Sequence, residues 1–276
     1  MTNLREIVKR LLDLAPRDAT IQGLEGRMEI GPQTESEQGS TTVKRVLVAT
    51  YPSARVVTKA SQDRSNLVVT YRPLFPYAID RLSGLDLVRV RLLVKNYISS
   101  YVVGSGWLSA DGGLNDALVE SLGLTKVRNF EASSDYGQWV AIGRVCLPPG
   151  SRNHSGFVNY VAEKLGLDSI TFTGDLDEDV KETLVIAGSH VDMPEIINAK
   201  KQDIGTLVTG EISPEVRLMA QEEGLNILEL GAFVTEEPGM ETLRNVLSLE
   251  FPELNIDFIE SKPVTKTLRP YSKDMA

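Results

Sequence analysis

Cysteine and histidine are scarce in this chain of 276 residues, and their scarcity excludes several kinds of site. The one cysteine, Cys146, cannot form an intramolecular disulfide or a cysteine-based zinc site, and a lone thiol fits a reducing cytoplasm. The two histidines, His154 and His190, lie on separate predicted elements, and neither has another ligand type four residues away on a clear helix face. We therefore expect no metal site built on these residues.

Basic residues and long apolar runs are also in short supply. The chain has 29 Lys and Arg against 38 Asp and Glu, a formal net charge of −9, whereas binding to nucleic acids or anionic membranes needs a local excess of basic side chains. Residues 2–14 place Arg5, Lys9, Arg10 and Asp13 among their apolar positions, unlike a signal peptide or a membrane span. We expect a soluble, cytoplasmic protein without a nucleic-acid or membrane partner.

What is present is an alternation of short strands and helices, with enough hydrophobic residues, 42%, for a well-buried core. Helical spacing marks residues 4–12, residues 31–42 are typical of an exposed loop, and residues 262–276 of a polar tail. Between them, strand-like runs at 46–50, 67–70, 98–103, 139–145, 183–187 and 206–208 alternate with helical patterns at 53–61, 85–97, 153–165, 194–200 and 213–223. This alternation predicts an α/β fold with largely parallel or mixed sheets covered by helices, in two domains.

Five short segments follow one another in the order of a known family. They are a strand and turn at 46–53, a strand at 66–75 that runs into Tyr71-Arg72-Pro73, a strand and glycine loop at 100–116 that ends in Gly-x-Asn-Asp, and two shorter segments at 209–212 and 227–236. Between Val46 and Ser261 the chain resembles the Nif-three-like family of dinuclear metal-centre proteins, the GTP cyclohydrolase I type 2 homologues.

The resemblance implies a fold and an assembly. It implies two α/β domains with mixed sheets flanked by helices, in which a middle domain at 128–227 is inserted into a first domain made of residues 1–127 and 228–276. The returning chain would then place residues 231–236 beside Tyr71 and Gly104. The resemblance also implies a homo-oligomer, a dimer or a ring of dimers, and, in an active member, two divalent metal ions that serve a metal-dependent hydrolase.

Most of the family's metal ligands are replaced in this chain. Tyr71 and Arg72 stand where the family has two adjacent histidines, and the register places Gly104, Leu108 and Ala232 at further ligand positions. The family's glutamate is kept as Glu236. Because arginine has no lone pair to donate, we expect no metal cofactor at this position.

A carboxylate left in a cavity without its metals needs another cation nearby, or it takes up a proton. We therefore hypothesise that Arg72 pairs with Glu236 and occupies the place of the lost metals. The alternative is that Arg72 points to solvent while Glu236 caps the helix that begins after Thr235.

The predicted function is that of a metal-free pseudoenzyme with a degenerate metal site, which binds a small anionic, nucleotide-like ligand or a protein partner. No catalytic residue is assigned. Tyr101 and Trp107 would offer aromatic faces to a planar ligand, or they pack in the core. Two alternatives stay open: a metal-dependent hydrolase whose ligands come from Asp111 or Asp116, and a structural oligomer subunit. The candidate pocket comprises seven residues at the former metal site: Tyr71, Arg72, Gly104, Trp107, Leu108, Ala232 and Glu236.

Two further features allow more than one interpretation. Residues 185–194 run from a strand through a glycine turn into a helix, which suits a bound phosphate or, as we favour, a helix capped by Asp192. A basic stripe accompanies the helix at 85–97, where it forms a solvated surface or, by the resemblance, lines a channel or an interface. The stripe consists of Arg81, Arg89, Arg91 and Lys95.

Overall fold

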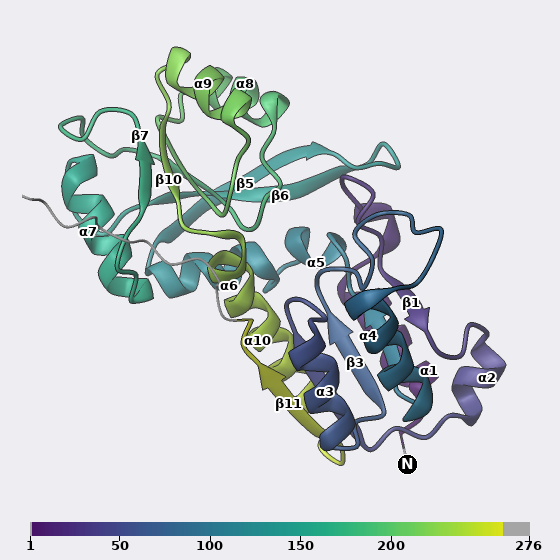
Figure 1. Ribbon diagram of the computed structural model, residues 1–276. Helices are drawn as coiled ribbons and strands as arrows, with labels where there is room; N and C mark the ends of the chain where they lie inside the picture. Colours follow the sequence, from purple (N-terminus) through teal and green to yellow (C-terminus); the bar gives the residue numbers. More distant parts are fainter. Residues whose placement is uncertain (1, 262–276) are drawn as a thin grey trace, which may run out of the picture.

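The computed structural model describes residues 2–261, which form two adjoining α/β units (Figure 1). Each unit contains one mixed sheet flanked by helices, as the sequence pattern predicts. The polar tail predicted at 262–276 lies outside the described residues. Among the helices of residues 2–261, none is both long and apolar enough to cross a bilayer.

The first sheet combines strands from both ends of the chain. Its order is β1-β4-β3-β2-β11, in which β1 pairs antiparallel with β4 and all other neighbours are parallel. Asn255 pairs with Arg45, so the last described strand lies beside β2 although about two hundred residues separate them in sequence. The strands are β1 (Arg27–Ile30), β2 (Arg45–Ala49), β3 (Leu67–Thr70), β4 (Ser99–Val102) and β11 (Asn255–Ile259).

The second sheet takes its strands from one continuous stretch of chain. Its order is β5-β6-β8-β9-β10-β7, and only β8, β9 and β10 are mutually parallel. The β5–β6 hairpin and β7 add antiparallel strands at the two edges. The strands are β5 (Thr125–Ser133), β6 (Trp139–Leu147), β7 (Thr171–Thr173), β8 (Thr183–Ile186), β9 (Thr206–Thr209) and β10 (Asn226–Glu229).

Helices cover both faces of the first sheet because its central strands are apolar on both sides. In β2, Val46 and Val48 belong to one core cluster while Leu47 and Ala49 belong to another, as the alternation of side chains along a strand requires. The cluster around Leu47 is completed by α3 (Ala54–Gln62) and α4 (Gly84–Lys95). The cluster around Val46 is completed by α1 (Leu4–Leu14), α6 (Leu114–Leu122) and α10 (Ala232–Glu250).

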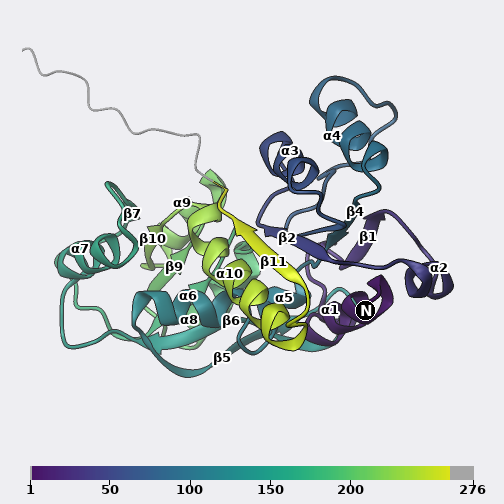
Figure 2. The same cartoon turned by 90° about the horizontal axis from the view of Figure 1, so that it is seen from below.

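The core of the first unit continues into the second through α6 and α10. Val46 of β2, Leu243 of α10 and Val185 of β8 belong to one hydrophobic cluster. Figure 2 shows α10 running from the second unit to β11 of the first. On the second sheet, α8 (Met193–Lys201) and α9 (Pro214–Glu222) lie on one face, and α6 and α7 (His154–Leu165) on the other (Figure 1). The short helices are η1 (Arg17–Ala19), α2 (Glu35–Ser40) and α5 (Gly106–Ser109).

The prediction of an exposed loop at 31–42 is wrong in part. Residues Glu35–Ser40 form α2, which begins with a capping box in which Thr34 and Glu37 bond to each other's backbone N–H groups. The side chain of Gln38 is buried and donates to the carbonyl of Pro32 at 3.1 Å. The Thr-x-x-Glu spacing that starts this helix is visible in the sequence. The helix was missed because the segment has no large apolar residues and so shows no helical hydrophobic pattern.

The prediction of a basic stripe around α4 is wrong for Arg89. This side chain is buried, forms an ion pair with Asp86 and donates to the carbonyl of Pro52 at 3.0 Å. The helix therefore turns Val88, which is 44% exposed, toward solvent instead. The other three members of the stripe are exposed: Arg81, Arg91 and Lys95.

The asparagine of the Gly-x-Asn-Asp loop joins the two units. The side chain of Asn115 is fully buried, and its Nδ2 donates to the carbonyls of Leu108 at 3.0 Å and Ile142 at 2.9 Å. Its Oδ1 accepts the N–H of Ala187 at 2.9 Å. One side chain thus links α5, β6 and the end of β8.

The aspartate of the same loop is committed to a buried arginine of β6. Arg144 donates to both carboxylate oxygens of Asp116, from Nε at 2.6 Å and from Nη2 at 2.9 Å. The same guanidinium donates to the carbonyls of Ala141 at 2.9 Å and Ala110 at 3.0 Å. Burial raises the pKa of Asp116, but the hydrogen bonds and charge of Arg144 outweigh it and hold that pKa below its usual range. Asp116 is an ionised structural group.

Replacement of Asn115 by alanine should destabilise the protein strongly, because two buried carbonyls and one buried N–H would lose their partner. We expect the free energy of unfolding to fall by about 2–4 kcal/mol, measured by urea denaturation. The matched control is Asn96→Ala, since the exposed side chain of Asn96 makes one hydrogen bond among the described residues, to the carbonyl of Leu92 near the end of α4. It should cost less than about 1 kcal/mol. Equal losses in the two variants would show that Asn115 does not join the units.

Candidate functional site

The carboxyl ends of parallel strands from both sheets face one another. In the first sheet, β2 and β3 end at Ala49 and Thr70, and in the second sheet β8, β9 and β10 end at Ile186, Thr209 and Glu229. The residues that follow these strands come together around one cavity. In α/β folds this edge of a sheet is where ligands bind, because loops there carry side chains on a rigid support.

Arg72 and Glu236 form the central contact of this region. Arg72 follows β3, and its backbone N–H donates to the carbonyl of Thr50 at 2.9 Å. Its Nε donates to Oε2 of Glu236 at 3.2 Å, and its Nη2 donates to Oε1 of the same carboxylate and to Oγ of Ser189 at 3.0 Å. The pairing predicted from charge balance is therefore confirmed, and neither residue takes the alternative role of a solvent-exposed arginine or a helix cap.

Glu236 lies in the first turns of α10 and is completely buried, whereas the Arg72 side chain is 24% exposed. Gly188 gives the carboxylate room, since a Cβ at that position would lie 2.5 Å from Oε1 of Glu236. Burial raises the pKa of Glu236, and the charge and hydrogen bonds of Arg72 oppose that rise. Arg72 is thus the cation that allows a carboxylate to be buried here.

A second chain of hydrogen bonds lies beside this ion pair. The buried Tyr71 hydroxyl is 2.6 Å from Nε2 of His190, and Nδ1 of His190 is 2.8 Å from Oε1 of Gln22. Burial, and to a smaller extent the charge of Arg72, lowers the pKa of His190 to about 3, while burial raises the pKa of Tyr71 well above its usual value. A neutral His190 that donates from Nδ1 to Gln22 accepts a hydrogen bond from the Tyr71 hydroxyl at Nε2, so both ring nitrogens are occupied.

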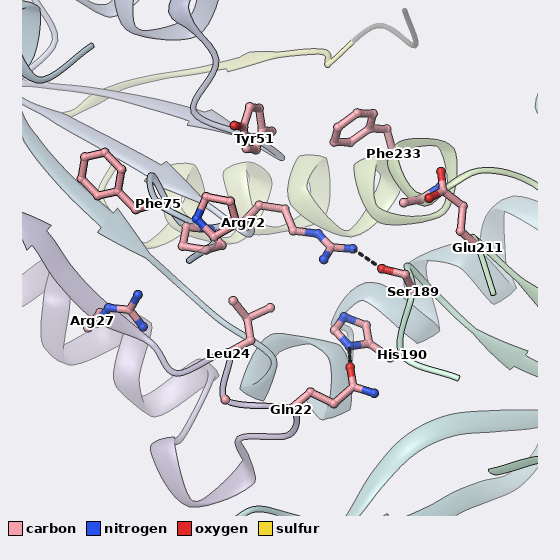
Figure 3. Close-up of a pocket in the computed structure, with 14 residues that line it drawn as sticks. Gln22, Leu24, Arg27, Tyr51, Arg72, Phe75, Ser189, His190, Glu211 and Phe233 are labelled. Atoms are coloured by element: carbon pink, nitrogen blue, oxygen red, sulfur yellow. Dashed lines mark hydrogen bonds between the residues drawn. The ribbon is translucent and has the colours of Figure 1, made fainter. Parts of the chain in front are cut away.

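The cavity in front of these groups has a volume of about 480 Å³, within the range of small-molecule sites. Figure 3 shows Tyr51, Phe75 and Phe233 on one side of it, with the Arg72 side chain reaching in below them. The Tyr51 and Phe233 rings are tilted at 46° with their centroids 6.3 Å apart. The remaining wall consists of Gln22, Gly23, Leu24, Arg27, Pro73, Pro76, Ser189, His190, Glu211 and Ala232.

Four of the seven residues predicted for the pocket meet here. Arg72 and Ala232 line the cavity, and Tyr71 and Glu236 lie directly behind it through the bonds to His190 and Arg72. The structure does not bring Trp107 and Leu108 to the cavity, because both are buried in the core. Trp107 donates from Nε1 to the carbonyl of Gly239 at 3.1 Å and so packs α5 against α10. Tyr101 is likewise a core residue.

Gly104 is covered by another part of the chain. It has a φ of +75°, and a Cβ at this position would lie 2.5 Å from the carbonyl oxygen of Leu24 and 2.6 Å from the nitrogen of Gly26. The hairpin of the second sheet holds this crossing segment in place, because the Asp135 carboxylate accepts the N–H groups of Gln22 at 3.1 Å and Gly23 at 2.8 Å. Backbone therefore fills the space into which a side chain at position 104 would point.

Several lining residues were not predicted from the sequence. Tyr51, Phe75 and Glu211 lie inside segments that carried the resemblance, but no ligand role was assigned to them. Their common signal is that each follows a predicted strand by a few residues, as do Ser189 and His190 after β8. Gln22 had no such signal. The turn before α8 is capped by Asp192 in a capping box with Glu195, so the capping prediction is confirmed.

Nearly the whole chain is similar to a known protein family. A family model described as Duf34/NIF3 (NGG1p interacting factor 3) matches residues 2–266. The chain belongs to the Duf34/NIF3 family. This membership confirms the resemblance that the order of the five segments indicated.

Curated Duf34/NIF3 relatives match nearly full length. A protein of Clostridium perfringens named GTP cyclohydrolase 1 type 2 homolog is 29% identical over 264 residues, which cover 94% of this chain and 96% of the relative. A protein of the same name from Methanocaldococcus jannaschii is 24% identical over 257 residues, with 92% and 99% covered.

Solved structures of the Duf34/NIF3 family share the fold. The Bacillus cereus protein related to NIF3 superimposes with a TM-score of 0.82 at 17% identity, over 96% of this chain and 99% of that one. Reduced HcgD from Methanocaldococcus jannaschii gives a TM-score of 0.74 at 22% identity, over 93% and 97%. At these identities the agreement establishes architecture alone.

The residues at the Duf34/NIF3 metal position do not fit two divalent metal ions. A metal site needs several converging lone-pair donors, and here the one retained carboxylate, Glu236, is bound through both oxygens by Arg72. Among residues 2–261 no group of three or more His, Cys, Asp or Glu side chains could hold a metal. Of the two proposed replacement ligands, Asp116 is bound to Arg144, and Asp111 is exposed in the glycine loop.

Substitution of Gly104 tests whether the Duf34/NIF3 ligand position is closed. Gly104→Ala should lower the free energy of unfolding by more than about 3 kcal/mol, since the new Cβ meets backbone atoms and the residue has a positive φ. Gly112→Ala is the matched control, with a φ of +72° and nothing within 4 Å of the added Cβ. It should cost only about 1 kcal/mol. Urea denaturation measures both, and equal costs would mean that position 104 is open.

The dependence of Glu236 on Arg72 predicts a pH-dependent defect. In Arg72→Met the buried carboxylate loses its cation, so its folded-state pKa rises further above the unfolded value. Stability from such a group is complete below the unfolded pKa and is lost as pH rises through the folded pKa. We expect a loss of about 2–3 kcal/mol near pH 8 and a clearly smaller loss near pH 5.5.

The control for this experiment is the double variant Arg72→Met/Glu236→Gln, which replaces the buried charge by a neutral amide. It should recover most of the lost stability at the higher pH and show little pH dependence relative to the wild type. Urea denaturation at both pH values provides the comparison. A loss in Arg72→Met that is the same at both pH values would contradict the role given to Arg72.

Proposed function

We propose that this chain is a metal-free, non-catalytic member of the Duf34/NIF3 family that binds a small aromatic anion in the cavity in front of Arg72. The observation that carries this proposal is the direct pairing of Arg72 with Glu236. A guanidinium that neutralises the retained carboxylate supplies the positive charge that metals supply in a dinuclear site.

Arg72 retains hydrogen-bonding capacity for a ligand. Its Nε and Nη2 are used by Glu236 and Ser189, whereas its Nη1 has no hydrogen-bond partner among the described residues. The side chain also lines the cavity. Two N–H groups on a permanently charged planar group can donate to a carboxylate or phosphate oxygen.

The aromatic wall defines the rest of the ligand. Tyr51, Phe75 and Phe233 present ring surfaces to the cavity, and flat ligands gain from offset or tilted stacking on such rings. Arg89 makes a cation–π contact with Tyr51, in which its guanidinium carbon lies 5.8 Å from the ring centroid. The contacts of Tyr51 with Arg89 and Phe233 restrict its ring before a ligand arrives, which lowers the entropic cost of binding.

His190 and Glu236 are not placed to act as general bases. His190 has both nitrogens in hydrogen bonds and a pKa far below neutrality, and Glu236 is buried and bound on both oxygens. A general base needs a free lone pair within reach of a substrate proton. Neither residue offers one in this arrangement.

Metal loading and anion binding together test the proposal. Purified protein incubated with zinc, manganese or iron(II) and then desalted should contain well below one metal ion per chain by elemental analysis, because too few donors converge. 3-Phenylpropanoate, an aromatic monoanion, should bind in the millimolar range, as expected for a small ligand. Chemical-shift perturbation in NMR spectra measures its affinity.

The matched variants for this test are Arg72→Met and Arg91→Met. Arg72→Met should weaken binding of 3-phenylpropanoate at least about tenfold, since a charge-assisted hydrogen bond is lost and Glu236 is left without its cation. Arg91 is exposed on α4, so its replacement should leave the affinity unchanged. About two metals per chain, or equal anion affinity in Arg72→Met and the wild type, would refute the proposal.

A further inference from the structure

Glu211 is a second charged group at the Arg72 end of the cavity, and an anion-binding site does not require it. It follows β9, is exposed to solvent, and lines the cavity. Figure 3 shows Arg72 and Glu211 reaching into the same end of the cavity, from opposite sheets. A site for a simple anion would be better without a carboxylate there, because like charges repel.

The position of Glu211 is fixed by the backbone around it. Its Oε1 accepts the N–H of Ala232, the first residue of α10, at 3.3 Å. The N–H of Glu211 itself donates to the carbonyl of Gly188 at 3.2 Å. Glu211 is therefore held at the cavity mouth, where it presents its second carboxylate oxygen, Oε2, which has no hydrogen-bond partner among residues 2–261.

The side chains at the Arg72 end of the cavity carry an excess of negative charge. Among the described residues, two cations line the cavity. Arg27 pairs with Glu29 on the side away from Glu211 (Figure 3), and Arg72 is already neutralised by Glu236, so Glu211 adds a further negative charge. The free Nη1 of Arg72 remains a directional donor for a carboxylate, and Glu211 remains an acceptor for an ammonium group. A ligand with both groups close together would satisfy both side chains without adding net charge to the site.

We infer that the cavity selects the zwitterionic head of an α-amino acid with an aromatic side chain, its carboxylate on Arg72 and its ammonium group on Glu211. The ring then lies against Tyr51, Phe75 and Phe233. This inference rests on the proposed function, since it places the anionic group at Arg72, and it adds the recognition of a cation. Binding of such a ligand is non-covalent and involves no chemical step.

Three small probes separate the contributions of the two charges. L-Phenylalanine carries both head groups, 3-phenylpropanoate lacks the ammonium group, and phenethylamine lacks the carboxylate. In the wild type, L-phenylalanine should bind about three- to fivefold more tightly than either of the others, the size expected for one partly exposed ion pair. NMR chemical-shift titrations near neutral pH give the three affinities.

Glu211→Gln should change two of these affinities in opposite directions. It should weaken L-phenylalanine about three- to fivefold, because the ammonium loses its partner, and it should strengthen 3-phenylpropanoate, because a repulsive charge is removed. Structural damage would weaken both. Glu222→Gln, at an exposed position on α9 outside the cavity, is the matched control and should change neither affinity.

The outcomes separate this inference from the proposed function. If 3-phenylpropanoate binds through Arg72 but L-phenylalanine binds no more tightly, or if Glu211→Gln weakens both ligands, the amino-acid inference is wrong and anion binding stands. If none of the three probes binds the wild-type protein, both fail. Preference for L-phenylalanine together with the opposite shifts in Glu211→Gln establishes the inference.

Discussion

The ion pair between Arg72 and Glu236 is the interaction on which the geometry of the two facing sheet edges depends. It joins the end of β3 to the first turns of α10, the helix that carries the chain from the second sheet back to the first. Because Glu236 is fully buried, separation of β3 from α10 would leave its carboxylate without a cation inside the protein, which is energetically costly. Ser189, bound to the same guanidinium, ties the end of β8 to this contact.

The order of strands, helices and motifs could be read from the sequence because it depends on local periodicity and on segments of fixed order. The ion pair could be predicted as well, because a glutamate retained at a former ligand position needs a cation, and Arg72 stands at a neighbouring ligand position. The placement of Gln22 could not be predicted, because no feature of its own segment indicates that Asp135 of the β5–β6 hairpin binds its backbone or that its side chain contacts His190. Trp107 was misplaced for a related reason: its segment carries the resemblance, but the structure turns its ring into the core, where Nε1 donates to the carbonyl of Gly239.

The cavity combines features that a dinuclear metal site would not need. Aromatic rings from β2, β3 and α10 meet at one wall, and a neutral histidine and a tyrosine are locked to each other at the other. A metal site concentrates lone pairs at one point, whereas this cavity is lined by aromatic rings, the two guanidinium groups of Arg27 and Arg72, and the carboxylate of Glu211. Under the proposed function, recognition of a ligand's shape and charge pattern takes the place of metal coordination as the source of specificity.

The crossing of residues 24–26 over Gly104 has a consequence for any substitution at that position. A histidine introduced at position 104 would meet main chain, and main chain cannot be moved aside by a rotamer change. The path of the N-terminal segment would have to change first, and with it the contacts between Gln22 and the β5–β6 hairpin. A single substitution therefore cannot place a histidine at position 104 in this fold, because the main chain of residues 24–26 occupies the space that its side chain needs.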